Sequence, residues 1–178
     1  TDDEFVAFCE HYPDCMVEIS ADGEITIMPP NYSRTGEING WIVAQLVMWA
    51  RANGKGRCVD SSGGFVLPNG ARRAADAAWI RTERITALPA EQRQKFYHLC
   101  PDFVIELRSA NDRLSRLQAK MQEYLANGAQ LGWLIDPLGK QVVIYRPHQA
   151  PEIKLAPDKL AGEGPVESLL LDLSEIWD

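Results

Sequence analysis

The chain has 178 residues, a length that fits one domain. Hydrophobic residues make up 46% of it and charged residues 24%, which excludes a disordered chain and is typical of a globular protein with a sizeable core. Lys and Arg number 18 against 25 Asp and Glu, and the resulting formal net charge of −7 argues against loose, purely electrostatic binding to a polyanion.

The sequence has no sign of a membrane span or of a disulfide scaffold. No apolar run approaches the roughly 20 residues of a transmembrane helix, and the stretch TDDEFVAFCE is too acidic for a signal peptide. The four cysteines form no CxxC pair, and no zinc-finger or ribbon spacing joins them to the histidines, so we expect reduced, buried thiols in a cytoplasmic protein. They are Cys9, Cys15, Cys58 and Cys100.

The N-terminal third predicts a short helix, a hairpin and a long helix. Residues 2–11 have apolar side chains at helical spacing. The runs CMVEIS and EITIMPP flank an Asp-Gly pair, which predicts a hairpin that starts the sheet. From Ser33 or Thr35, either of which can cap a helix, an apolar stripe continues to Asn53, and Gly54 follows as a C-cap.

The middle of the chain changes to short strands. Residues 56–80 contain apolar runs broken by Gly-Gly and Pro-Asn-Gly, which predict strands joined by tight turns, with Asp76 inside the last of them. A turn or short helix is expected at 89–97. The run PDFVIELRS then predicts an apolar strand that contains Glu106.

The C-terminal part alternates helix and strand. The run SANDRLSRLQAKMQEYLANG predicts a helix that starts near Asn111 or Asp112 and stops at Asn127 and Gly128. LGWLIDP and QVVIYRP predict two strands, the first apolar enough to be central, and EIKLAP predicts an edge strand. The tail SLLLDLSEIW predicts a strand end and a short helix that packs Ile176 and Trp177 on the body.

This order of elements indicates one domain over residues 1–178, of mixed α/β class, with helices flanking a central sheet. A homodimer is a further expectation, because Trp41, Trp49 and Trp177 can leave an apolar patch on the surface. The same three side chains can equally belong to the core.

Two strand carboxylates form the pattern most informative about chemistry. Asp76 lies between alanines and Glu106 within an apolar run, so burial of either charge needs a partner or a metal. For Asp76 an ion pair with Arg72 or Arg73 would suffice. For Glu106 the corresponding partner is Arg108, two residues along the strand. Converging carboxylates, however, make an oxygen-rich site suited to Mg²⁺ or Mn²⁺.

Lys120 follows these acids on the predicted helix. It lies beside the apolar stripe, so its ammonium can reach inward. The alternative is a solvated lysine that pairs with Glu123. The stripe consists of Leu114, Leu117, Met121, Tyr124 and Leu125.

The segment VIELRSANDRLSRLQAKMQEYLANGAQLGWLIDP closely resembles the Uma family, formerly a domain of unknown function, within the PD-(D/E)xK restriction-endonuclease-like superfamily. The resemblance extends from MPPNYSRTGEINGWI through RRAADAAWI to VVIYRP, and so covers nearly all of the chain. It implies a restriction-endonuclease-like core, a central mixed sheet flanked by helices, with Asp76 and Glu106 as metal ligands. The superfamily pattern would place its lysine where this chain has Arg108. In the Uma family the lysine comes from the following helix, which matches Lys120.

Four further residues are secondary candidates. Gln118 precedes Lys120 by two residues, about 200° around a helix, so both do not point straight into one cleft. Glu37 resembles an additional acid of the superfamily, although a charge at a helix N-terminus is the alternative interpretation. Ser109 can position a phosphate or cap the next helix. Arg108 can fill the role of the lysine.

The resemblance implies a metal-dependent endonuclease that hydrolyses phosphodiester bonds of nucleic acid, with DNA as the expected partner and Mg²⁺ or Mn²⁺ as the cofactor. The metal would polarise the phosphate and lower the pKa of a water, while Lys120 stabilises charge. The alternative is a nuclease-fold protein without turnover that serves as a binding, scaffold or regulatory module, which the net charge and Arg108 favour. Other enzyme motifs, such as GxSxG, the P-loop and HExxH, are absent from the sequence.

Overall fold

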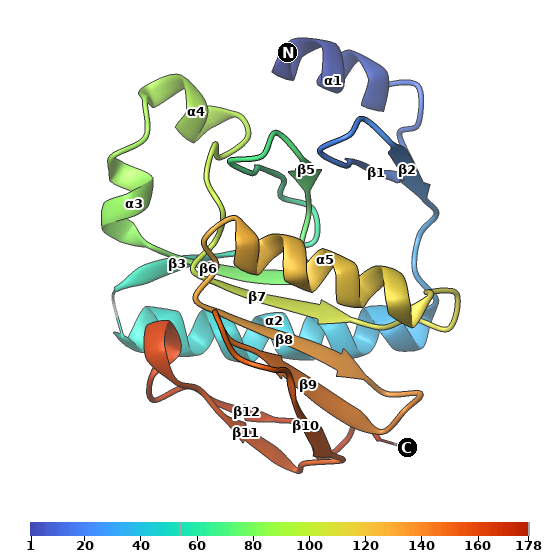
Figure 1. The fold of residues 1–178 in the computed structure, drawn as a ribbon, viewed down its shortest axis with the longest axis vertical. Helices are drawn as coiled ribbons and strands as arrows, with labels where there is room; N and C mark the ends of the chain where they lie inside the picture. Colours follow the sequence, from blue (N-terminus) through green and yellow to red (C-terminus); the bar gives the residue numbers. More distant parts are fainter. Residues whose placement is uncertain (54, 178) are drawn as a thin grey trace.

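The structure, a computed structural model, describes residues 1–53 and 55–177. Its centre is a six-stranded mixed sheet (Figure 1). The strands in order across this sheet are β10 (Glu152–Leu155), β9 (Gln141–Tyr145), β8 (Leu131–Asp136), β7 (Phe103–Leu107), β6 (Ala77–Arg81) and β3 (Gly56–Asp60). β7 and β8 run parallel, and the other neighbours are antiparallel. The predicted edge position of EIKLAP is therefore confirmed.

A long helix covers each face of the sheet (Figure 1). α2 (Ser33–Asn53) has the predicted bounds and packs on one face; the expected C-cap at Gly54 lies outside the described residues. α5 (Leu114–Ala126) packs on the other face and ends as predicted, where Gly128 has a φ of 108°. The core beneath α2 includes Ile42, Leu46, Trp79, Phe103, Ile105 and Trp133, and the core beneath α5 includes Ile80, Val104, Met121, Tyr124 and Leu134.

The hairpin expected at the start of the chain lies outside the central sheet. β1 (Met16–Ile19) and β2 (Ile25–Met28) pair antiparallel, as predicted. β1 also pairs with β5 (Arg72–Arg73), and β5 pairs with β4 (Phe65–Val66), so the hairpin belongs to a separate four-stranded sheet. The expectation that it starts the main sheet was wrong, because alternation predicts a strand but not its distant partner.

The remaining elements are short. α1 (Asp2–Cys9) and α4 (Ala90–Gln94) match the expected helical or turn segments, whereas α3 (Thr82–Thr86) was not predicted. A 3₁₀ turn (Gly164–Val166) connects β11 (Lys159–Ala161) to β12 (Leu170–Asp172), and these two strands pair with each other.

The predicted helix after β12 is wrong. Residues 173–177 form a turn and a bend with no helix, although Ile176 and Trp177 are buried as expected. The backbone amide of Leu173 donates to the carbonyl of Asp158 instead of forming a helical hydrogen bond. The segment is also too short to nucleate a helix on its own.

The three tryptophans considered for an apolar surface patch have different environments. Trp49 and Trp177 pack on the core beneath α2, whereas Trp41 is 46% exposed. They therefore do not form one patch, and the homodimer stays a prediction. In the described part of the chain, no helix is both long and apolar enough to cross a bilayer.

Candidate functional site

The pairing of β6 with β7 brings Asp76 and Glu106 together. In this antiparallel register Ala77 lies opposite Ile105, so Asp76 lies next to Glu106. Side chains alternate along a strand, and Val104 belongs to the core beneath α5, so Glu106 projects to that same face. Both carboxylates line one cleft of about 470 Å³.

Asp76 lies immediately before β6 rather than inside a strand, which corrects the sequence prediction. Its Oδ2 accepts a hydrogen bond of 2.7 Å from the backbone amide of Leu107. The side chain thus binds the neighbouring strand where the backbone ladder ends. This contact fixes the carboxylate beside Glu106. Arg72 and Arg73, the ion-pair partners considered for Asp76, contact Asp2, Glu18 and Glu123 instead.

Lys120 reaches the carboxylates from α5. Its Nζ lies 2.9 Å from Oε1 and 3.1 Å from Oε2 of Glu106. It also lies 2.8 Å from Oε1 of Glu18 and donates to the carbonyl of Ala74 at 2.9 Å. The side chain is only 12% exposed, so the arrangement is that of an inward lysine rather than a solvated one. Glu123, the alternative partner, pairs with Arg73 at 2.5 Å.

Glu18 is a member of this site that the sequence interpretation missed. It lies on β1, is buried, and accepts a hydrogen bond of 2.9 Å from the backbone amide of Ala74. Arg73 approaches its other oxygen at 3.3 Å. The available signal was an acid flanked by apolar residues in MVEI, the same pattern that drew attention to Glu106 in VIEL.

Burial and neighbouring charges govern the ionisation of the two metal-ligand candidates. Burial raises the pKa of Asp76 to about 6 and the pKa of Glu106 to about 8. The negative charges of Asp76 and Glu18 also raise the pKa of Glu106, while the ammonium of Lys120 opposes the rise. Additional positive charge, such as that of a bound metal ion, would therefore favour the ionised form of Glu106.

The other two members of the cluster are held in their charged forms. Burial alone would raise the pKa of Glu18, but the charges of Lys120 and Arg73 and the amide of Ala74 hold it below its usual value. Burial alone would lower the pKa of Lys120, but Glu106 and Glu18 hold it above its usual value. Lys120 is thus a fixed ammonium.

The donor set of Asp76 and Glu106 fits a hard divalent cation. Carboxylate oxygens are the ligands that Mg²⁺ prefers, and Mg²⁺ often takes only one or two carboxylates and keeps several waters. The buried Oε1 of Glu106 has no directed hydrogen bond in the described part of the chain, although Lys120 is near. No set of three or more His, Cys, Asp or Glu side chains among the described residues is placed to hold a metal. Waters or substrate oxygens would therefore complete the coordination.

Ser109 and Asp112 form the edge of the cleft. Both the backbone amide and Oγ of Ser109 donate to Oδ2 of Asp112 at 2.7 Å. α5 begins only at Leu114, with Arg113 as its N-cap and no side-chain cap among the described atoms. The predictions that Ser109 caps this helix and that the helix starts near Asn111 or Asp112 were wrong, because Asp112 folds back on Ser109.

The other secondary candidates do not line the cleft. Arg108 pairs with Asp136 on β8 at 3.0 Å and does not line the cleft. Glu37 is exposed on α2, on the far face of the sheet, where it lies 3.3 Å from Arg34. Gln118 is exposed on α5, outside the cleft.

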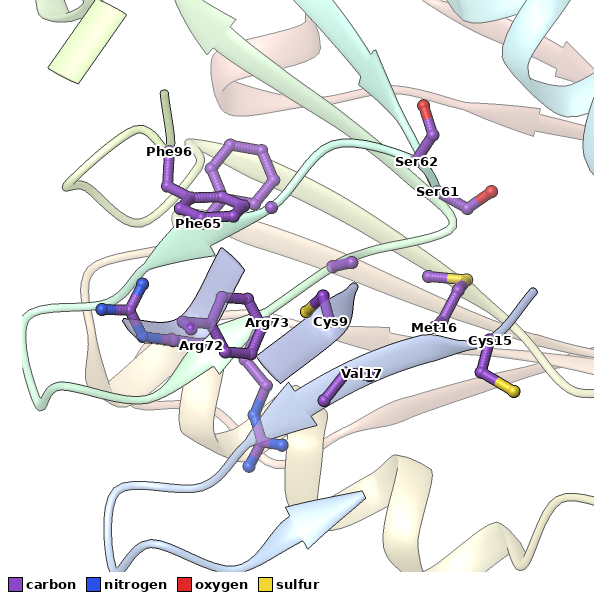
Figure 2. Close-up of a pocket in the computed structure, with 13 residues that line it drawn as sticks. Cys9, Cys15, Met16, Val17, Ser61, Ser62, Phe65, Arg72, Arg73 and Phe96 are labelled. Carbon is purple, nitrogen blue, oxygen red and sulfur yellow. The ribbon is translucent and has the colours of Figure 1, made fainter. Parts of the chain in front are cut away.

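A second pocket, of about 300 Å³, lies between α1 and the four-stranded sheet that contains β1 and β5 (Figure 2). Arg72 stacks on the rings of Phe5 and Phe96 and pairs with Asp2 at 2.7 Å. Figure 2 shows the guanidinium groups of Arg72 and Arg73 pointing to different sides of the pocket. Its lining has no carboxylate or imidazole, so it offers no metal ligand of that kind and no acid or base of hydrolytic chemistry.

The mixed sheet between α2 and α5 has the restriction-endonuclease-like fold of nuclease-like proteins. The chain belongs to the Uma2 family, described as "Putative restriction endonuclease", whose model matches residues 2–174. A similar fold occurs in the crystal structure of "a putative nuclease belonging to DUF820 from Anabaena variabilis". That structure matches with a TM-score of 0.81 and 23% identity over 99% of this chain and 97% of its own. A comparison with curated proteins found no match.

Proposed function

We propose that this protein is a metal-dependent endonuclease that hydrolyses phosphodiester bonds of nucleic acid, with DNA as the expected substrate and Mg²⁺ or Mn²⁺ as its cofactor. The observation that carries the proposal is the convergence of Asp76, Glu106 and Lys120 in one cleft. Family membership supports it, because the description of the family is that of a nuclease. The resemblance in fold supports it as well.

Asp76 and Glu106 would hold the metal. When bound, the ion supplies positive charge that polarises a phosphate oxygen and lowers the pKa of a water. The amide of Leu107 keeps Asp76 oriented, so the carboxylate needs little rearrangement to bind. The fixed ammonium of Lys120 stabilises the negative charge that develops on the phosphate, and Glu18 and the Ala74 carbonyl hold that ammonium in place.

The contact between Lys120 and Glu106 is also compatible with the alternative function, a nuclease-fold protein that does not catalyse a reaction. The ammonium of Lys120 lies close to both oxygens of Glu106, so the lysine itself offsets the buried negative charge. In that arrangement the cluster would be structural, and the protein would act as a scaffold or regulatory module. A measurement of metal binding distinguishes the two functions, because only the endonuclease requires a bound metal ion.

The first experiment measures thermal unfolding with and without Mg²⁺ or Mn²⁺, together with cleavage of labelled DNA. We expect the metal to raise the melting temperature of the parent protein but not of Asp76→Ala, and only the parent to cleave. Glu37→Gln is the matched control, because that acid is exposed on the opposite face. Equal melting temperatures with and without metal, and no cleavage, would give the structural alternative.

A further inference from the structure

The cleft above Asp76 has two walls from distant parts of the chain. One wall is the β1–β2 hairpin with the segment 29–32 that follows it, and the other is the loop and first turns of α5. Figure 1 shows the hairpin and this segment passing beside the N-terminal end of α5. The side chain of Arg116 joins the walls: it donates to Oγ1 of Thr26 and lies 3.9 Å from Glu24.

The size of this cleft limits what reaches the carboxylates. A volume of about 470 Å³ is that of a pocket for one drug-sized ligand, comparable to a nucleotide. Glu106 is only 2% exposed, so a phosphate has to enter between the walls to approach it. In duplex DNA the bases are paired and stacked, so a nucleotide of the duplex enters such a space only at the cost of unpairing and unstacking. A nucleotide of an unpaired single strand enters without that cost.

The walls carry groups that suit an unpaired nucleotide. Tyr32 is 60% exposed and lines the cleft, so its ring is available to stack on a base. Arg113 and Arg116 also line the cleft and are exposed, whereas the other cations there, Arg73 and Lys120, are held in partly buried ion pairs. The apolar part of the lining includes Met16, Ile27, Met28, Pro29, Pro30 and Leu117.

We infer that the substrate of this cleft is a single-stranded polynucleotide, with Tyr32 stacking on a base and Arg116 contacting a phosphate. This inference rests on the proposed function and narrows its substrate class. Because the overall net charge of −7 gives no broad electrostatic attraction to any polyanion, binding depends on these local groups.

The test uses fluorescein-labelled oligonucleotides of about 20 nucleotides, longer than a typical single-strand site. The arms are single-stranded DNA, single-stranded RNA of the same sequence, and blunt duplex DNA. Anisotropy measures binding with Mg²⁺ present, and gels of the same samples measure cleavage. We expect at least one of the two single strands, DNA or RNA, to bind about tenfold or more tightly than the duplex. Equal or tighter binding of the duplex would overturn the inference.

Variants test the named contacts. Tyr32→Ala and Arg116→Ala should each weaken single-strand binding by about tenfold, and Arg116→Ala should also reduce its salt dependence. Tyr12→Ala and Arg51→Ala, exposed positions outside the cleft, are the matched controls and should bind as the parent does. Unchanged binding by both cleft variants would refute the assignment.

The failure of this inference is distinct from the failure of the proposed function. Metal-dependent cleavage that favours the duplex would leave the endonuclease intact and remove the single-strand preference. Absence of both a metal-induced thermal shift and cleavage would refute the endonuclease. The anisotropy comparison still decides for or against a single-strand cleft in that case, because it needs no turnover.

Discussion

Nζ of Lys120 lies 2.8 Å from Oε1 of Glu18, and this ion pair joins α5 to the hairpin strand β1. The two residues belong to different structural units, since α5 covers the central sheet and β1 belongs to the separate sheet. The pair therefore connects the hairpin, one wall of the cleft, to the helix that carries Lys120. It also sets the position of the ammonium relative to Glu106.

Replacement of Glu18 should affect both stability and rate. Glu18→Gln keeps the size of the side chain but removes one of two carboxylates that hold Lys120. Loss of a partner in a buried ion pair costs about 3 kcal/mol in the free energy of unfolding, and we expect a rate loss of about tenfold as the ammonium loses its orientation. Urea unfolding and cleavage kinetics measure these. Glu91→Gln, an exposed acid paired with Lys95, is the control. Parent-like stability and rate in Glu18→Gln would contradict a positioning role.

Lys120 should matter more for rate than for metal binding. In Lys120→Met the cation is lost, so we expect cleavage to fall by about 100-fold. Mg²⁺ affinity should be kept or increased, because the ammonium competes with the ion for Glu106. Calorimetric titration with Mg²⁺ and single-turnover kinetics separate the two effects. Full activity in this variant would show that the lysine assignment is wrong.

Arg108 should contribute to stability without taking part in catalysis. It pairs with Asp136, which is 1% exposed, so Arg108→Gln leaves a buried acid with fewer partners. We expect the free energy of unfolding to fall by about 3 kcal/mol, with the cleavage rate per folded molecule unchanged at a temperature well below unfolding. A large rate loss in the folded variant would contradict this prediction and would indicate that Arg108 has the catalytic role of the superfamily lysine.

The metal-free protein should lose stability as pH rises through neutrality. The pKa of Glu106 is about 8 in the folded chain against an ordinary 4.5, and that of Asp76 is about 6 against 3.8. The folded state therefore binds more protons than the unfolded state, so this contribution is present in full below about pH 4 and is lost progressively up to about pH 8. Urea unfolding across this range in EDTA measures the slope. Glu106→Gln should flatten it, and a parent stability that rises with pH would contradict the raised values.

Metal binding should release protons for the same reason. A cation needs both carboxylates ionised, so Mg²⁺ binding near pH 7 displaces the proton held mainly by Glu106. Calorimetric titrations in two buffers of different ionisation enthalpy should therefore give different apparent heats. Equal heats in the two buffers would mean that no proton leaves.

Local sequence patterns determined most of the elements. The helical spacing from Ser33 to Asn53 and the apolar run around Glu106 predicted α2 and β7 because each depends on neighbours along the chain. The same reasoning, with the family resemblance, singled out Asp76, Glu106 and Lys120. An acid in an apolar strand is visible from its flanking residues alone.

Only the tertiary structure determined which distant residues lie together at the cleft. Glu18 enters through a contact with Lys120 that spans 102 positions, and the hairpin joins β5 rather than the central sheet. Asp112 binds Ser109 instead of starting a helix. These outcomes depend on competition between long-range partners for buried charges and backbone groups, and that competition leaves no periodic pattern in the sequence.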